Sequence, residues 1–376
     1  MIMSKHIAIF TVSEKFFMSH RLPIALGLNK AGYKITLITK ANQVDSKLKN
    51  YPFITVKDIS FHPQKVNLYE TLKSVIELSL FFRKNTIDIV HNYGMKPILF
   101  GTIAARLGGV HNIFNTFTGL GILFASNKRP LLTQLYEFLL TYLVFSSKYV
   151  SGIFQNKENK QIFVNKKILK KSQAHIIRGS GVDTSVYEYI PEKNGDIVVT
   201  LASRLIKSKG ILEYLLAAEK VSALFPNVQF HIIGEENPNG ADPLDFDTNR
   251  WKQKHFIVWS DHQDDMVSKI QSSHIIVLPT YYGEGVPKIL IEAASCGRPC
   301  ITTDWPGCND IVQDNVNGLL VIPKDVDSLA QAMIKLIEDK GLRVQFGLAG
   351  RDRVCREFDE EIVLERTIDL YDFRLK

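Results

Sequence analysis

The sequence predicts an α/β protein built from two Rossmann-like halves. Its 376 residues, 45% of them hydrophobic, fit two domains better than one ordinary core. Strand-like apolar runs alternate with amphipathic, helix-like stretches along the whole chain, which is the pattern of βα units. The alternation is interrupted once, by a stretch rich in turn residues at 179–196, and then starts again.

The first half opens with a βαβ unit. The apolar runs 6–10 and 34–39 have the composition of buried parallel strands. The amphipathic stretch 20–33 between them predicts a helix that stops at Gly32. A further helix is expected at 97–109, and further strands are expected at 53–60, 87–94, 111–119, 148–156 and 174–183.

The second half repeats this organisation. Helices are expected at 210–225, from Pro287 to Gly297, and at 361–375, with strands at 196–203, 228–234, 255–260, 275–279 and 299–304. We therefore expect a first domain at 1–182, a hinge at 183–195, a second domain at 196–354, and a terminal helix at 355–376 that packs back towards the first domain. Ligands of such sheets bind beyond the carboxyl ends of the strands, here in a cleft between the halves.

Charge is divided unevenly between the halves. Residues 1–190 carry 25 Lys and Arg against 10 Asp and Glu, and residues 191–376 carry 21 against 29, so their net charges are +15 and −8. A basic half suggests an anionic surface or ligand, with nucleic acid and an acidic lipid leaflet as candidates. A difference in solubility between two domains would give the same numbers.

Several function classes lack their signals. The start of the chain has no signal-peptide pattern, and no apolar stretch is long enough to span a membrane. The nearest approach, 129–148, predicts a buried helix, with an interfacial membrane helix as the alternative. The four cysteines have no histidine at zinc-site spacing and indicate reduced thiols in the cytosol. The first strand is not followed by G-x-G-x-x-G, which argues against a dinucleotide oxidoreductase.

Two glutamates dominate the stretch 281–312. Gly283 and Gly285 flank Glu284 and allow a ligand to approach the backbone closely. Pro287 suits the first turn of a helix, whose unpaired N–H groups favour an anion. On a helix, Glu292 would lie roughly 12 Å further along the axis. Hydrolase carboxylate pairs are closer, at about 5–9.5 Å, so these acids would hold the two ends of a long ligand such as a sugar nucleotide, unless both are simply exposed.

A diphosphate between those two ends needs cations. Arg204 and Lys209 follow the expected strand 196–203 and would therefore lie at a strand end, facing the cleft. An arginine can hold phosphate oxygens bidentately, and a lysine adds a point charge. Solvated surface residues are the alternative interpretation.

These segments resemble a known family. The segments 203–211 and 283–321, with the two glutamates separated by seven residues, look like the retaining family-four glycosyltransferases of the GT-B fold, in which two Rossmann-like domains face each other across a cleft. The segments 17–33, 88–97, 115–121 and 234–246 look most like a bacterial subgroup that extends undecaprenyl-diphosphate-linked sugars, including bacillosamine-extending N-acetylgalactosaminyltransferases.

The resemblance implies a retaining hexosyltransferase that needs neither a metal nor a cofactor. It would move a sugar, such as the N-acetylhexosamine GalNAc, from a UDP-sugar to an undecaprenyl-diphosphate-linked sugar in glycan, capsule or O-antigen assembly. Glu284 would bind the donor sugar hydroxyls and Glu292 the ribose, while Arg204 and Lys209 would stabilise the departing diphosphate. The donor would also meet Gly283 and the backbone of Gly285, Val286, Pro287 and Lys288.

Two segments depart from the family pattern. Where many members have Gly-Gly in the first loop, this chain has Ser19, His20 and Arg21, which could face the acceptor diphosphate together with His91 and Lys96. Where many members have His or Glu beside the donor sugar, this chain has Thr118. This residue leaves the identity of the donor sugar open, and a 6-deoxy sugar would fit. A further candidate is Trp259, where the nucleotide base would lie.

A lipid-linked acceptor would explain the positive net charge of the first half of the chain. The first domain would bind the acceptor and dock on the anionic cytoplasmic face of the inner membrane as a peripheral protein, with 73–84 and 129–148 as contacts. Asp245–Asp247 resembles a metal-binding motif of another glycosyltransferase fold, but no metal is expected. The alternatives are a transferase with another nucleotide sugar or a soluble acceptor, a sugar-nucleotide epimerase, and a non-enzymatic binder of membranes or nucleic acid. The last would have no use for the paired glutamates, so no nucleic-acid partner is expected.

Overall fold

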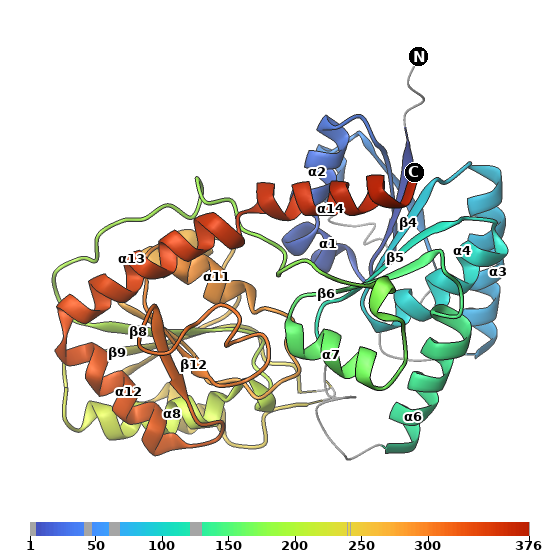
Figure 1. Cartoon of the computed structure of the whole chain (residues 1–376). Helices are drawn as coiled ribbons and strands as arrows, with labels where there is room; N and C mark the ends of the chain where they lie inside the picture. Colours follow the sequence, from blue (N-terminus) through green and yellow to red (C-terminus); the bar gives the residue numbers. More distant parts are fainter. Residues whose placement is uncertain are drawn as a thin grey trace. The chain divides into compact units, whose positions relative to one another are not determined.

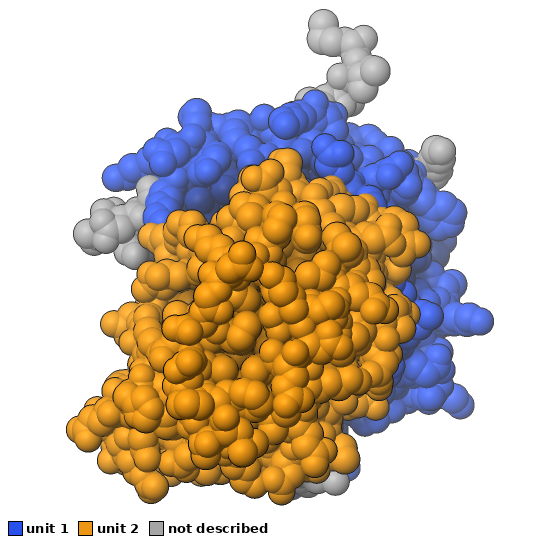
Figure 2. All heavy atoms as spheres, turned by 90° about the vertical axis from the view of Figure 1, so that its left-hand side faces the viewer, with its two compact units in different colours: residues 1–180, 360–376 blue, residues 181–359 orange. Residues whose placement is uncertain are grey.

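The chain divides into two compact units (Figure 2). Each unit has its own parallel sheet. The computed structural model describes residues 5–40, 47–59, 68–120, 130–238, 240 and 242–375. Unit 1 consists of residues 1–180 together with 360–376, and unit 2 consists of residues 181–359. The last helix of the chain therefore belongs to the first unit.

Unit 1 contains a seven-stranded sheet in the order β3-β2-β1-β4-β5-β6-β7, with every pair of neighbours parallel. The chain runs outward from β1 in one direction and from β4 in the other, so the order reverses between these two strands. The strands are β1 (His6–Phe10), β2 (Lys34–Thr39), β3 (Ile54–Asp58), β4 (Ile89–Tyr93), β5 (Asn112–Phe117), β6 (Val150–Phe154) and β7 (Ala174–Ile176).

Helices cover both faces of this sheet, and its central strands are buried on both sides (Figure 1). Ile7 and Ile9 of β1 join a core with α1, α2 and α14, whereas Ala8 and Phe10 point to the opposite core with α3, α4, α6 and α7. The helical elements are α1 (Glu14–His20), α2 (Leu22–Lys30), η1 (Lys47–Asn50), α3 (Leu68–Lys84), η2 (Pro97–Gly101), α4 (Thr102–Leu107), α6 (Pro130–Leu139), η3 (Leu140–Val144), α7 (Lys157–Asn165), η4 (Lys171–Gln173) and α14 (Glu360–Leu375).

Unit 2 contains a six-stranded sheet in the order β10-β9-β8-β11-β12-β13, also parallel throughout. Its order reverses between β8 and β11. The strands are β8 (Val198–Ala202), β9 (Gln229–Ile233), β10 (Ile257–Ser260), β11 (Ile275–Leu278), β12 (Cys300–Thr303) and β13 (Gly318–Val321).

The same alternation divides the core of unit 2. Ile275 and Val277 of β11 pack with α8 and α12, whereas Ile276 and Leu278 pack with α10, α11 and Val354 of α13. The helical elements are η5 (Lys207–Lys209), α8 (Ile211–Ser222), α9 (Thr248–Lys252), α10 (Met266–Gln271), α11 (Lys288–Ser295), α12 (Val326–Glu338) and α13 (Lys340–Glu357). The predicted fold class, two parallel Rossmann-like domains, is confirmed.

Three expectations about individual segments change. The helix expected at 97–109 is a π-helical turn, η2, followed by α4. The segment 129–148 is not a uniformly buried helix, because Leu131, Leu135 and Phe138 of α6 are more than half exposed, while only its other side and η3 enter the core. Residues 183–195, expected to form a hinge, lie on unit 2 and are bonded to it through the bidentate Glu192–Arg343 pair.

Within the residues that the structure describes, no helix combines the length and the hydropathy needed to cross a bilayer.

Candidate active site

Two connections meet where the strand order of unit 2 reverses. The turn η5 follows β8, and the loop 279–287 follows β11 and leads into α11. Because β8 and β11 are neighbouring parallel strands, both connections leave the same edge of the sheet. This is the position at which open α/β sheets bind ligands. It brings Lys209 and Glu284 together.

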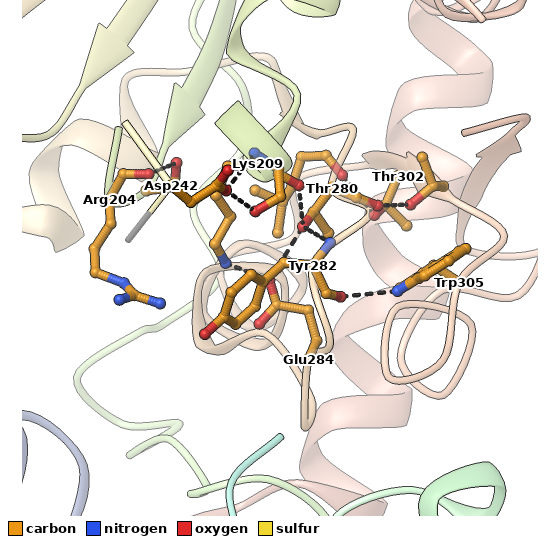
Figure 3. Close-up of polar contacts among 12 residues, drawn as sticks. Arg204, Lys209, Asp242, Thr280, Tyr282, Glu284, Thr302 and Trp305 are labelled. Carbon is orange, nitrogen blue, oxygen red and sulfur yellow. Dashed lines mark hydrogen bonds and ion pairs between the residues drawn. The ribbon is translucent and has the colours of Figure 1, made fainter. Parts of the chain in front are cut away.

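Lys209 and Glu284 form an ion pair at this edge (Figure 3). The Lys209 Nζ donates to Glu284 Oε1, and Thr280 Oγ1 donates to the same oxygen at 3.2 Å. The two side chains are 10% and 11% exposed, so water screens their attraction only weakly. The pair is thus a preformed, nearly dry electrostatic site.

Tyr282 lies beside both predicted cations. Its ring centre is 5.5 Å from Arg204 Cζ and 5.7 Å from Lys209 Nζ (Figure 3). Arg204 is exposed, and among the described residues its guanidinium has no hydrogen bond or ion pair. Arg204, Lys209 and Glu284 together carry one net positive charge, which suits an anionic ligand.

Close backbone packing fixes the loop that carries Glu284. Gly307 has φ +89°, and a Cβ there would lie 1.9 Å from the carbonyl oxygen of Gly285. The Trp305 Nε1–H donates to the carbonyl of Tyr282 at 2.8 Å, holding the same loop from the other side. Only glycine at 307 allows the two turns to touch.

Asp242 fixes the turn that carries Lys209. Its Oδ2 accepts from the backbone N–H of Ser208 at 2.9 Å and from the Ser208 hydroxyl, and its carbonyl accepts from Lys207 N at 3.2 Å. Asp242 lies in the segment 234–246, so that segment supports the lysine turn rather than forming a separate site.

Glu292 lies inside the first turns of α11 and is held by two donors. The Tyr187 hydroxyl and Lys288 Nζ each donate to Glu292 Oε1 at 2.7 Å. Burial first, and then the charge of Glu292, raises the pKa of the Tyr187 phenol, so the phenol stays protonated and donates. In the described part of the chain, Oε2 accepts no bond.

The axial spacing expected for the two glutamates is wrong. Glu284 precedes α11, which begins at Lys288, so only the last part of the interval between the glutamates is helical. Pro287 is the N-cap, and no side chain caps this end, so the first N–H groups of the helix are not bonded by a capping side chain. Val286 is buried, and Gly283 lies in the loop before it.

The remaining predicted donor residues, Trp259 and Thr118, belong to other elements than those that carry Lys209 and Glu284. Trp259 is on β10, the edge strand separated from β8 by β9, with its ring 5.0 Å from Lys252 Nζ. Thr118 follows β5 in unit 1.

The predicted acceptor residues all belong to unit 1. Ser19 and His20 end α1, with 2.6 Å between Ser19 Oγ and His20 Nδ1. Arg21 joins α1 to α2 and is only 2% exposed. Lys96 precedes η2, and partial burial lowers the pKa of its amine.

His91 lies in the core of unit 1, in the middle of β4. Its Nδ1 is 2.5 Å from the hydroxyl of Tyr371 and its Nε2 is 2.7 Å from Thr116 Oγ1, so both ring nitrogens have partners. Burial, reinforced by Arg21, lowers the pKa of His91 well below its usual value, and the ring is neutral.

The sequence did not identify several residues that shape the site. Tyr282 directly precedes Gly283 in the stretch 281–312, so an aromatic residue next to the predicted site was a usable signal. No local pattern marks Tyr187, Asp242 or Trp305, which are brought to the site by the fold alone.

The described residues contain no group of three or more His, Cys, Asp or Glu side chains that could hold a metal ion. The carboxylate of Asp245 pairs with Lys207, and that of Asp247 caps α9. Cys296, Cys300 and Cys308 are buried, and burial raises the pKa of each thiol to about 12.

Two family models match the chain, one on each half. Residues 6–173 match the model described as glycosyl transferase 4-like, and residues 188–353 match the model described as glycosyl transferases group 1. The second match contains Arg204, Lys209, Glu284 and Glu292.

Similar curated proteins match over most of their length. A UDP-Gal:alpha-D-GlcNAc-diphosphoundecaprenol alpha-1,3-galactosyltransferase of Escherichia coli is 26% identical, over 82% of this chain and 81% of its own. An N,N'-diacetylbacillosaminyl-diphospho-undecaprenol alpha-1,3-N-acetylgalactosaminyltransferase of Campylobacter jejuni is 24% identical, over 96% of this chain and 98% of its own.

Solved structures share the fold at low identity. A glycosyltransferase of Rickettsia africae superposes with a TM-score of 0.80 at 17% identity, covering 100% of this chain and 99% of its own. HepE of Anabaena, in complex with UDP and glucose, gives 0.81 at 16% identity, covering 98% and 99%. Both halves are matched by glycosyl transferase models, and the whole chain superposes on a glycosyltransferase structure, so this protein belongs to the group 1, family-four glycosyltransferases of the GT-B fold.

Proposed function

We propose that this glycosyltransferase moves a sugar from a UDP-sugar to an undecaprenyl-diphosphate-linked sugar, with retention of the anomeric configuration and without a metal ion. The observation that carries the proposal is the Lys209–Glu284 pair together with the guanidinium of Arg204, which forms no hydrogen bond or ion pair with any described residue. The names of the two curated relatives, both of which act on diphospho-undecaprenol-linked sugars, support the acceptor class.

The donor would lie along the edge of the unit 2 sheet. Arg204, Lys209 and the N-terminus of α11 supply positive potential for the diphosphate. Glu284 would exchange part of its contact with Lys209 for the hydroxyls of the donor sugar. Glu292 keeps Oε2 for the ribose hydroxyls while Tyr187 and Lys288 hold Oε1.

Retention follows from chemistry on one face of the sugar. The bond between the anomeric carbon and the β-phosphate oxygen breaks, and the departing oxygen takes the bonding pair. The acceptor hydroxyl then bonds to the anomeric carbon on the same face and gives its proton to the departing phosphate. Arg204 and Lys209 stabilise negative charge that grows only as this bond breaks, so they lower the barrier.

The donor sugar we propose is an N-acetylhexosamine such as GalNAc. The E. coli relative is named as a galactosyltransferase that uses UDP-Gal and the C. jejuni relative as an N-acetylgalactosaminyltransferase, which supports a galacto-configured sugar. Thr118 is short and neutral, so a 6-deoxy sugar is the second candidate for the donor. Trp259 is proposed to lie near the base.

Turnover of site variants tests the proposal. Glu284→Gln and Lys209→Ala should each lower kcat at least about 100-fold, because Lys209→Ala removes a cation that stabilises the departing diphosphate and Glu284→Gln removes the carboxylate that positions the donor sugar. Asp245→Asn, on an exposed ion pair, is the matched control and should keep near-normal activity. Near-normal turnover in both site variants would refute the site, and activity lost on chelation would refute metal independence.

We further propose that unit 1 docks on an anionic membrane, at the cytoplasmic face of the inner membrane. Unit 1 carries 28 Lys and Arg against 13 Asp and Glu, a net charge of +15. Two helices on the same side of its sheet have exposed apolar stripes at helical spacing. The stripes consist of Tyr69, Leu72, Ile76 and Leu80 on α3, and Leu131, Leu135, Phe138 and Tyr142 on α6 and η3.

Vesicle flotation tests this surface. The protein should float with vesicles that contain phosphatidylglycerol, less so as salt rises, and poorly with pure phosphatidylcholine. Leu72→Glu with Leu135→Glu should abolish flotation, because charges replace the centre of each stripe. The control is Leu224→Glu in unit 2, an equally exposed leucine. Equal flotation of all three proteins would exclude these helices as the docking surface.

A further inference from the structure

Arg21 is a buried cation without a balancing charge. The side chain is 2% exposed, and its Nε is completely buried without a hydrogen bond. Its Cζ lies 4.3 Å from the ring centre of Tyr93 and 5.8 Å from that of Phe16. Among the residues that the structure describes, no carboxylate pairs with it.

This arrangement is unfavourable unless something else completes it. Burying an ion without a partner costs several kcal/mol, which is why buried charges are normally paired. Burial lowers the pKa of Arg21, but an arginine stays protonated at neutral pH. His91, Tyr93 and Tyr371 interact electrostatically with Arg21, but they are neutral and cannot compensate its charge.

The position of Arg21 is as informative as its burial. It lies in the connection that follows β1, and its guanidinium rests on Tyr93, the last residue of β4. The strand order of unit 1 reverses between β1 and β4. Arg21 therefore stands at the ligand-binding position of its sheet.

Unit 2 has a cation at the equivalent place. Lys209 follows β8, and Glu284, which neutralises it, follows β11. In unit 1 the connection after β1 supplies the cation Arg21, but the neighbouring strand, β4, ends in Tyr93. Unit 1 thus repeats the cationic half of the pair without the carboxylate.

We propose that Arg21 anchors an anionic phosphate or diphosphate group that enters unit 1 where its strand order reverses. Resting on the proposed function, the inference deepens it: the group is the diphosphate of the lipid-linked acceptor. A guanidinium presents a planar fork of donors that matches phosphate oxygens. His20 stacks on the same Phe16 ring, with 4.8 Å between the centroids, so a second side chain with N–H groups lies beside the ring that Arg21 approaches.

Thermal-shift titration with inorganic diphosphate tests the anion site directly. The experiment uses the full chain with saturating UDP, so that the nucleotide site is filled. Wild-type protein should gain Tm as diphosphate is added. Arg21→Met should weaken the apparent affinity by at least about tenfold, the effect of one charge-assisted hydrogen bond. Lys30→Met, which removes an exposed charge from the end of α2, should match the wild type.

The ligand-free Tm separates an anion site from a structural role. Removing an unbalanced buried charge should leave the Tm of Arg21→Met unchanged or raised. A clear fall in Tm with the diphosphate response intact would mean that the guanidinium merely packs on Tyr93, and would overturn the inference. Arg21→Lys keeps the charge but loses the fork, so it should retain an intermediate affinity.

Farnesyl diphosphate and UDP distinguish the source of the anion. Farnesyl diphosphate should compete with inorganic diphosphate, and Arg21→Met should raise the acceptor KM at least about tenfold while the donor KM stays constant. Competition by UDP that depends on Arg21 would assign the site to the donor and overturn the acceptor assignment. Binding of diphosphate needs no turnover, so this inference can fail or hold independently of the Glu284 and Lys209 variants.

Discussion

Lys209 and Glu284 neutralise each other at the edge of the unit 2 sheet, each at the start of a different connection. The attraction is strong because both side chains are almost dry, yet neither is sealed from solvent. A donor can therefore reach the pair and replace part of the Lys209–Glu284 contact, with its sugar hydroxyls at Glu284 and its diphosphate at Lys209. The site is assembled before the ligand arrives, which reduces the reorganisation that catalysis requires.

The ion pair should also contribute to stability. Glu284→Gln leaves Lys209 buried without its counter-charge and should lower the free energy of unfolding by about 2–4 kcal/mol. Glu284→Gln combined with Lys209→Met should recover most of that loss, because the uncompensated charge is gone. Urea unfolding of the two single variants and the double variant measures the coupling. Additive losses would show that the two side chains act independently.

Asp242 should influence catalysis through Lys209. Asp242→Ala releases Ser208 and loosens the turn, so kcat should fall about tenfold with little change in the donor KM. Asp242→Asn keeps an acceptor oxygen and should retain more activity. Steady-state kinetics check both, with Asp245→Ala as the control, since its pair with Lys207 is about half exposed. A parallel loss in the control would point to general disruption of the loop.

Tyr187 should tune the affinity for the nucleotide. Tyr187→Phe removes one of the two donors that orient Glu292 and should raise the Kd for UDP about tenfold. Isothermal titration measures this change. Tyr189→Phe is the control, because its ring packs on Gly297 and no described bond joins it to Glu292. An unchanged Kd in Tyr187→Phe would mean that Lys288 alone orients the carboxylate.

Unit 1 should lose stability as the pH falls below about 6.5. Burial holds the pKa of His91 well below its usual value and lowers that of His175 to about 4, whereas in the unfolded chain both titrate near 6.5. Below pH 6.5 the unfolded chain therefore binds more protons, so the stability present at higher pH is lost as the pH falls towards the folded pKa values.

A histidine variant isolates this contribution. Between pH 5 and 6.5, His91→Gln should reduce the slope of unfolding free energy against pH by up to about 1.4 kcal/mol per pH unit, the value for one proton. His111→Gln, at an exposed ring, is the control. Chemical unfolding at several pH values gives the slopes, and identical slopes in wild type and His91→Gln would contradict the expected linkage.

The sequence predicts the fold well because most of its strands are short apolar runs. Segments such as 6–10 and 34–39 leave little choice but a sheet covered on both faces. The site residues Arg204, Lys209 and Glu284 could also be predicted from the sequence, because each follows a recognisable strand and the ends of parallel neighbouring strands meet at one edge of the sheet.

Other features depend on contacts that no local pattern contains. Tyr187 reaches Glu292 across 105 positions, and Asp242 reaches Ser208 across 34. The burial of Arg21 could not be predicted from the sequence either, because a polar stretch such as Ser19–Arg21 suggests solvent exposure. For α6, composition left a core helix and an interfacial helix open, and only the packing shows which side chains stay outside.

The return of α14 to unit 1 has a consequence for biosynthesis. On the ribosome, the strands of the first unit emerge before those of the second, but Tyr371, the partner of His91, is made only after the whole of unit 2. Until then one face of the first sheet is covered by α1 and α2 without α14, so part of its apolar core stays exposed, whereas 181–359 is a continuous segment that can fold without later residues. Chaperones should therefore bind mainly the earlier half of the nascent chain. A premature stop near residue 359 should prevent complete folding of unit 1, although that unit is translated first.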